Sequence, residues 1–120
     1  MANNALHTVE QYQQKLGSGS DAWTDLITDD VSFVGPAMQV QGKQELGELN
    51  REFSKFIKGY ESISSFEQGD MALLEGVFTL QAPSGKTIQL PIAEVYEVEQ
   101  GKIRSIRVYY DAEEYRKEFS

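Results

Sequence analysis

Three short turn signals divide the second half of the chain into four strand-like runs. These signals are Gly69-Asp70, Pro83-Ser84-Gly85 and Gln100-Gly101. Glycine tolerates backbone angles that other residues avoid, and proline fixes φ, so such clusters favour tight turns. Strands are predicted at about residues 60–68, 71–81, 86–98 and 102–110. Strands joined by such short turns pair antiparallel with their neighbours along the chain, so this half is expected to form a meander.

The first half of the chain has mainly the period of helices. Leu6, Val9, Tyr12 and Leu16 recur at helical spacing. A loop at 17–20 then precedes a second short helix, for which Ser20 is the expected cap. Two short strands, Val31–Val34 and Met38–Gln41, are separated by Gly35-Pro36. A longer helix is predicted at 43–57 from the apolar stripe of Leu46, Leu49, Phe53, Phe56 and Ile57.

Helical segments followed by a long meander indicate an α+β fold. The 120 residues, of which 40% are hydrophobic, suit one domain spanning residues 1–120. We expect a curved, cone-shaped antiparallel sheet wrapped around the N-terminal helices, which would act as its lid.

The composition argues against several functional classes. A net charge of −8 disfavours nucleic acid and anionic membranes as partners. The chain has no cysteine, which excludes disulfides and thiolate chemistry. His7 is the only histidine, and no metal site or cofactor is expected. Because no segment approaches the ~20 apolar residues of a membrane span and no basic region precedes an apolar one, a cytoplasmic protein is expected.

The last hairpin allows a test of strand register. If Gln100-Gly101 is a two-residue turn, Glu99 faces Lys102. The same register then places Glu97 opposite Arg104, and Glu94 opposite Arg107. Three opposite-charge pairs would follow from one assumption, each worth ~0.2–1 kcal/mol.

This register also assigns residues to the two faces of the sheet. The interior face would carry Ala93, Val95, Ile106 and Val108, with Tyr110 further along. The outer face would carry Tyr96, Val98, Ile103 and Tyr109, together with Ile92 and Glu94. Because the second set is unusually apolar for a solvated face, we interpret it as a homodimer interface, with an ordinary exposed face as the alternative.

Asp111 follows the last strand, where a carboxylate can serve either catalysis or helix capping. Successive side chains of a strand point to opposite faces of the sheet. Since Tyr110 is expected to face the interior, Asp111 should point away from it unless a bulge intervenes. Glu114 lies three residues further on, a spacing close to that of a capping box. We therefore interpret Asp111 as the cap of a final short helix, with a catalytic role as the alternative.

The order of these elements resembles the nuclear transport factor 2-like superfamily, in particular its SnoaL-like and ketosteroid-isomerase-like branch. The resemblance covers nearly the whole chain and depends on Asp30-Val31, Gly35-Pro36, Gly42 and the segment from Glu97 to Asp111 with its Gly101-Lys102-Ile103 turn. It implies a cystatin-like α+β roll with an interior hydrophobic pocket. The fold alone does not imply one function, because it hosts isomerases, cyclases, dehydratases, epoxide hydrolases and binding proteins.

The catalytic residues of the superfamily are mostly not matched. The tyrosine of ketosteroid isomerases is matched by Tyr12, but their two aspartates fall on Gly35 and Ala93. Limonene-epoxide-hydrolase-like enzymes use a catalytic Asp-Arg-Asp set. Its positions fall on Val108 and near Glu75-Gly76-Val77, so the set is absent. The aspartate of polyketide cyclases falls on Tyr110, one residue from Asp111.

Two functional hypotheses remain open. The first is a small-molecule-binding domain with an apolar pocket and no complete family active site. Its expected lining is Tyr12, Trp23, Phe33, Gly35, Gly76, Phe53, Phe78, Leu80, Ala93, Val95, Ile106, Val108 and Tyr110. The second is a cyclase-like or isomerase-like enzyme acting on a hydrophobic carbonyl compound through Tyr12, Tyr110 or Asp111. The enzyme hypothesis requires a carboxylate inside the pocket, where burial would raise its pKa.

Overall fold

The structure, a computed structural model, describes residues 4–18 and 21–119, and no side chain for Glu114. Its elements in chain order are α1 (Ala5–Gly17), the 3₁₀ helix η1 (Ala22–Leu26), β1 (Ile27–Val34), β2 (Gln39–Gln41), α2 (Lys43–Ser54), β3 (Ile57–Gln68), β4 (Met71–Gln81), β5 (Thr87–Glu99), β6 (Lys102–Tyr109) and α3 (Ala112–Phe119). Ser20, the expected cap of the second helix, lies outside the described residues. The α+β class is confirmed.

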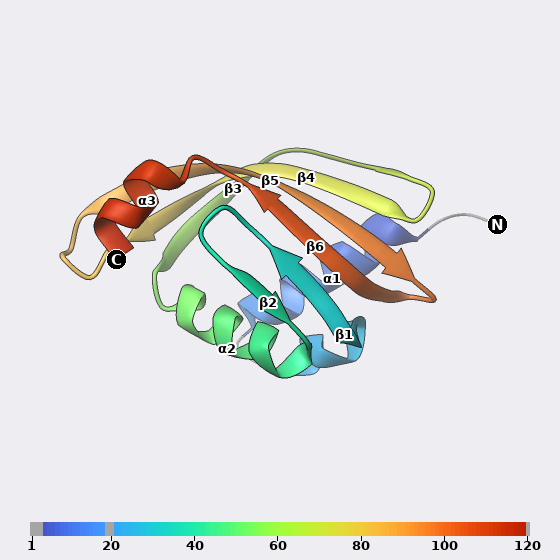
Figure 1. Cartoon of the computed structure of the whole chain (residues 1–120). Coiled ribbons are helices and arrows are strands. Elements are labelled where there is room, and N and C mark those ends of the chain that lie inside the picture. Colours follow the sequence, from blue (N-terminus) through green and yellow to red (C-terminus); the bar gives the residue numbers. More distant parts are fainter. Residues whose placement is uncertain (1–3, 19–20, 120) are drawn as a thin grey trace.

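One curved sheet organises the molecule, and α1 and α2 lie on its concave side (Figure 1). The strand order is β2-β1-β6-β5-β4-β3. Strands β3 to β6 form the expected antiparallel meander, while β1 pairs parallel with β6. Helix α1 packs across β3 to β6, whereas α2 packs on β1 and β2. Helix α3 lies at the end of the sheet near the β4–β5 hairpin.

The register predicted for the last hairpin holds only near its turn. Glu99 faces Lys102 and Val98 faces Ile103, as expected, but the register then shifts and Glu97 faces Ser105. Arg104 is therefore the extra residue of a β-bulge. The bulge lets Ile103 and Ile106, three positions apart, both point into the core, and both are almost fully buried.

The predicted faces are reversed for β5 and for Ile103, whereas Ile106 and Val108, beyond the bulge in β6, lie in the interior as predicted. Tyr96, Val98 and Ile103, assigned to the outer face, are buried, with exposed fractions of 2%, 8% and 0%. Ala93 and Val95, assigned to the interior, alternate with buried residues of β5 and lie on the outer face. A one-residue slip moves every side chain of a strand segment to the other face. The assignment of Tyr109 to the outer face agrees with its 57% exposure.

The charge pairs follow the corrected register. Glu97 forms the expected ion pair with Arg104, at 3.6 Å. Arg107 also binds Glu97, with Nη1 3.1 Å from Oε2, so the predicted pairing of Arg107 with Glu94 is wrong. Glu94 is instead on the concave side of the sheet, where it is 8% exposed.

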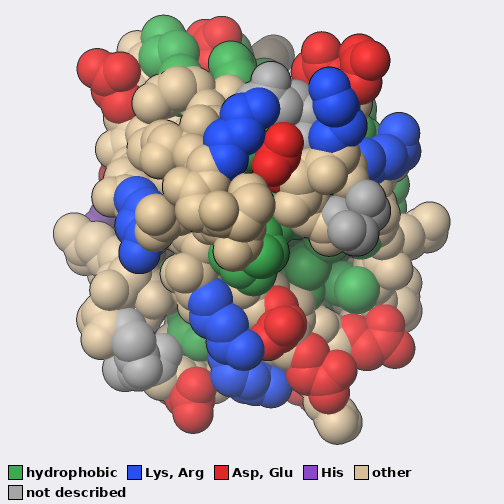
Figure 2. Space-filling view, turned by 90° about the vertical axis from the view of Figure 1, so that its left-hand side faces the viewer, with side chains coloured by type: hydrophobic (Ala, Val, Ile, Leu, Met, Phe, Trp, Pro, Cys, Tyr) green, Lys and Arg blue, Asp and Glu red, His purple; other side chains and the backbone are tan. Residues whose placement is uncertain are grey.

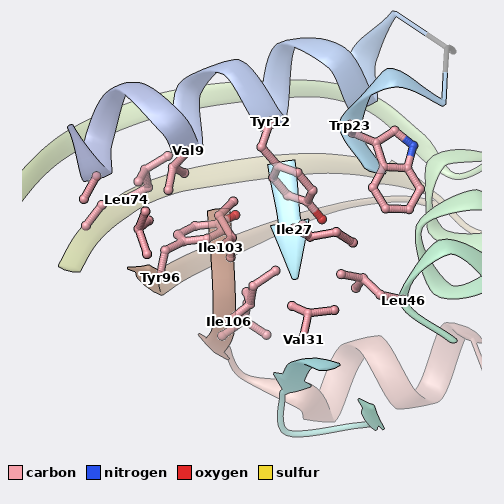
Figure 3. Close-up of a cluster of buried hydrophobic side chains, with 14 of the residues drawn as sticks. Val9, Tyr12, Trp23, Ile27, Val31, Leu46, Leu74, Tyr96, Ile103 and Ile106 are labelled. Carbon is pink, nitrogen blue, oxygen red and sulfur yellow. The ribbon is translucent and has the colours of Figure 1, made fainter. Parts of the chain in front are cut away.

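Two hydrophobic clusters fill the concave side. The larger cluster joins α1, η1, α2 and the sheet, and Figure 3 labels its main residues, Val9, Tyr12, Trp23, Ile27, Val31, Leu46, Leu74, Tyr96, Ile103 and Ile106. The smaller cluster consists of Leu80, Ile88 and Leu90, with Tyr115 and Phe119 of α3 against it. Phe78 and Tyr110 pack against both clusters. They therefore mark the place where the two clusters meet.

Candidate functional site

A cavity of about 640 Å³ lies on the concave side of the sheet. Most of its wall is apolar, and it is lined by Tyr12, Gln13, Leu16, Gly17, Asp21, Trp23, Phe33, Met38, Leu49, Asn50, Arg51, Phe53, Ser54, Ile57, Tyr60, Phe78, Leu90, Ile92, Glu94, Tyr96, Ile106, Val108, Tyr110 and Tyr115. The volume falls within the ~300–1,000 Å³ that is typical of small-molecule sites.

The lining residues form a closed interior and an open rim. Gly17, Asp21, Arg51 and Ser54 are exposed and come from the ends of α1 and α2 and the segment before η1. In contrast, Tyr12, Glu94 and Tyr96 are buried. Figure 2 shows the face that carries α3, with hydrophobic side chains in a central hollow between basic and acidic ones. The cavity thus has a charged rim and a buried interior.

Many residues predicted to line a pocket do line this cavity. They are Tyr12, Trp23, Phe33, Phe53, Phe78, Ile106, Val108 and Tyr110. Ala93 and Val95 do not, because they lie on the outer face. Leu80 is fully buried in the smaller cluster. Gly35 and Gly76 lie close to lining residues. A Cβ on Gly35 would be 2.8 Å from Val108 Cγ2, and one on Gly76 would overlap the Tyr60 hydroxyl.

The aromatic lining residues pack edge to face around the cavity. The ring of Tyr12 lies 6.2 Å from Trp23 and 6.3 Å from Tyr96 in T-shaped contacts. Phe53 and Phe78 are 5.4 Å apart with an interplanar angle of 89°. These arrangements hold each ring by its neighbours. The wall is therefore largely fixed in shape without a ligand.

Glu94 is the residue that the sequence analysis missed. Its Oε1 accepts a hydrogen bond from Gln13 Nε2 at 3.2 Å, and its carboxyl group is also hydrogen-bonded to the Tyr96 hydroxyl. Burial raises the pKa of Glu94 to about 7, and the two hydrogen bonds only partly oppose this effect. A buried carboxyl group with such a pKa changes protonation near neutral pH.

Several hydroxyl groups lie around this carboxyl group. The Tyr12 oxygen accepts a hydrogen bond from Asn50 Nδ2 at 3.0 Å, which leaves the Tyr12 proton available to another acceptor. Burial raises the pKa of Tyr12 and of Tyr96, and the nearby charge of Glu94 contributes to both shifts. Both phenols therefore remain hydrogen-bond donors.

Tyr60 contributes a third hydroxyl from strand β3. Gly76 leaves the space for it, because a Cβ there would overlap the Tyr60 hydroxyl. Burial and the charge of Glu94 raise the pKa of Tyr60. The buried interior of the cavity thus combines the carboxyl group of Glu94 with the phenols of Tyr12 and Tyr96, and the exposed Tyr60 adds a third phenol to the wall.

The two candidates at the end of the last strand are separated as predicted. Asp111 is exposed, and its Oδ1 accepts a hydrogen bond from the backbone N–H of Glu113 at 3.0 Å. It is the N-terminal cap of α3. The side chain of Glu114, the other half of the expected capping box, lies outside the described residues. Tyr110 lines the cavity, and its hydroxyl is hydrogen-bonded to the backbone of Ala37.

The described part of the chain offers no group of three or more His, Asp or Glu side chains that could hold a metal ion. None of the helices described is long and apolar enough to cross a membrane.

Comparison with known proteins identifies the family. The profile of the SnoaL-like domain matches residues 9–106, and the chain belongs to this family. A search of curated proteins finds no match to this sequence.

Solved structures share the fold at low sequence identity. An NTF2-like protein from Burkholderia xenovorans is 20% identical over 100% of this chain and 99% of its own, with a TM-score of 0.90. An NTF2-like protein of unknown function from Burkholderia pseudomallei is 16% identical over 99% of both chains, with a TM-score of 0.85. A third structure, from Jannaschia, is described as a SnoaL-like polyketide cyclase by assignment only. It is 15% identical over 98% of this chain and 92% of its own, with a TM-score of 0.81. At these identities the likeness establishes the fold.

Proposed function

We propose that this SnoaL-like domain binds a small, largely apolar molecule whose hydrogen-bond acceptor, such as a carbonyl oxygen, is placed beside Glu94. The observation that carries the proposal is a buried carboxyl group facing an apolar cavity of about 640 Å³. Burying a carboxyl group costs free energy that its hydrogen bonds to Gln13 and Tyr96 offset only in part, and a well-packed apolar core does not need such a group. Tyr12 and the protonated form of Glu94 are donors for an acceptor oxygen.

Binding of cyclohexyl methyl ketone tests this function. Because Trp23 is the only tryptophan and lines the cavity, its fluorescence reports occupancy. Tyr12→Phe removes one donor and is expected to weaken ketone binding about tenfold, the scale of one buried hydrogen bond. Tyr109→Phe, on the outer face, is the matched control and should bind like the wild type. Absence of ketone binding, or equal binding by Tyr12→Phe, would contradict the proposal.

Proton transfer is the second candidate, and the pKa of Glu94 favours it. A carboxyl group that titrates at about 7 can act as acid or base at neutral pH. It is also the buried carboxylate that the enzyme hypothesis requires, although it is not one of the candidates named from the sequence. Deuterium exchange into the methyl group of the same ketone, followed by NMR, distinguishes binding from catalysis. Catalysis predicts exchange that Glu94→Gln abolishes, whereas exchange no faster than in buffer contradicts it.

A homodimer through the outer sheet face remains part of the proposal, with different residues. Phe66 and Tyr109 are each 57% exposed. Leu73 faces Phe66 in the sheet and Ala93 faces Tyr109, so apolar side chains extend across neighbouring strands. Tyr109→Glu would place a charge within this face and is expected to shift a dimer toward monomer, as measured by sedimentation equilibrium. A wild-type protein that is monomeric at high concentration would refute the dimer. The cytoplasmic location likewise remains a proposal.

A further inference from the structure

The rim of the cavity carries one basic side chain, Arg51 of α2. It is the only Lys or Arg among the cavity-lining residues that the structure describes. Its guanidinium group lies close to the helix, since Nη1 is 3.4 Å from the point that a Cβ on Gly47 would occupy. That same point is 3.3 Å from Trp23 Cη2, so Arg51 is near another residue of the cavity wall. The charge is thus positioned at the entrance.

Arg51 differs from the other three arginines in having no partner for its charge. Arg104 and Arg107 bind Glu97, and Arg116 donates to the backbone oxygen of Pro36 at 2.8 Å. No carboxylate of the described residues lies within ion-pair distance of Arg51. The chain has 19 acidic and 11 basic residues, so carboxylates are in excess. An arginine that remains unpaired in such a protein is available to an external anion.

We propose that the ligand is an apolar carboxylic acid and that Arg51 binds its carboxylate at the rim of the cavity. This inference rests on the proposed function, since it assumes that a small molecule occupies the cavity. The apolar body of the ligand would contact Phe53, Phe78 and the other aromatic residues of the wall. The acceptor oxygen at Glu94 would be a second polar group of the ligand, and contact with Arg51 does not depend on it. Guanidinium groups bind carboxylates through two parallel hydrogen bonds, which also fixes the orientation of the ligand.

Two acidic groups limit the effect of Arg51. Asp21 is also on the rim, and Glu94 lies in the interior. Both disfavour a bound anion when they are ionised, so Arg51 has to outweigh them. The expected preference for an acid is accordingly about tenfold, which is modest for a charge-assisted pair.

Matched acids and amides test this inference. Cyclohexylacetate, naphthaleneacetate and adamantaneacetate are each compared with the corresponding neutral amide by isothermal titration calorimetry at pH 6. The wild type is expected to bind the acid of a fitting pair about tenfold more tightly than the amide. Arg51→Gln should abolish this preference, so that it binds the acid and the amide of a pair with similar affinity. Lys58→Gln removes the same charge from an exposed position outside the cavity lining, and its preference should persist.

The outcomes separate this inference from the proposed function. Equal binding of acid and amide by the wild type would overturn the role of Arg51 while leaving the ketone result intact. If Lys58→Gln loses the preference as well as Arg51→Gln, the preference comes from the overall charge of the protein and not from one site. That result also contradicts a site at Arg51. If no compound of the series binds and the ketone fails as well, both the inference and the proposed function are wrong.

Discussion

The Glu94→Gln variant is expected to gain about 3 kcal/mol of stability relative to the wild type as the pH rises from 4.5 to 7.5. Burial raises the pKa of Glu94 from its usual value of 4.5 to about 7. Between these values the unfolded chain loses the proton of this carboxyl group while the folded protein keeps it. The free energy of unfolding of the wild type therefore falls as the pH rises through this range. Glutamine does not ionise and lacks this contribution.

Urea denaturation at several pH values from 4.5 to 8, followed by Trp23 fluorescence, measures this difference. Other acidic residues also affect stability across the range, but their contributions are common to both proteins and cancel in the comparison. The absolute stability of the variant at pH 4.5 depends on how well the amide replaces the carboxyl group in its hydrogen bonds. The pH dependence of the difference is the diagnostic quantity. A constant difference between the two proteins would show that Glu94 does not titrate with a raised pKa.

Ile103→Ala is expected to lower the free energy of unfolding by about 2–4 kcal/mol. Ile103 is fully buried, and its truncation removes apolar contacts and leaves a cavity in the larger cluster. Val95→Ala is the matched control. The hairpin register without a bulge assigns Val95 to the interior, but it lies on the outer face and should lose less than about 1 kcal/mol. Equal losses in the two variants, or a larger loss for Val95, would mean that the bulge at Arg104 is wrong.

The architecture could be predicted because its signals are local. Tight turns and long runs of β-forming residues define the meander, and helical spacing defines α1 and α2. The observed strands β3 to β6 begin and end within three residues of the predicted bounds. The role of Asp111 as a cap was also predictable, because a cap depends on residues that are neighbours in sequence.

The candidate site could be predicted only in part. Tyr12, Trp23 and Phe53 were expected to line a pocket from their place in helices that cover a sheet, and they line the cavity. Glu94 was missed because its apparent pairing with Arg107 gave it a surface role. The sequence of β5 did contain a signal for its burial. Every second residue points to the same face of a strand, and Glu94 shares its face with the apolar residues Ile88, Leu90, Ile92, Tyr96 and Val98. Charge pairing near a hairpin turn was weaker evidence than this longer alternation.

The amino-acid sequence alone determines the α+β class and the order of the elements, because these follow from periodicities and turns within short segments. It also shows the family, through the match of residues 9–106 to the profile of the SnoaL-like domain. Only the tertiary structure decides which face of β5 and β6 is the interior. A single extra residue, Arg104, reverses that choice, and the free energy that selects the bulge comes from burying Ile103 and Ile106 together against helices distant in sequence. The same packing brings Glu94 next to Tyr12, Tyr60 and Gln13, and no local pattern records that proximity.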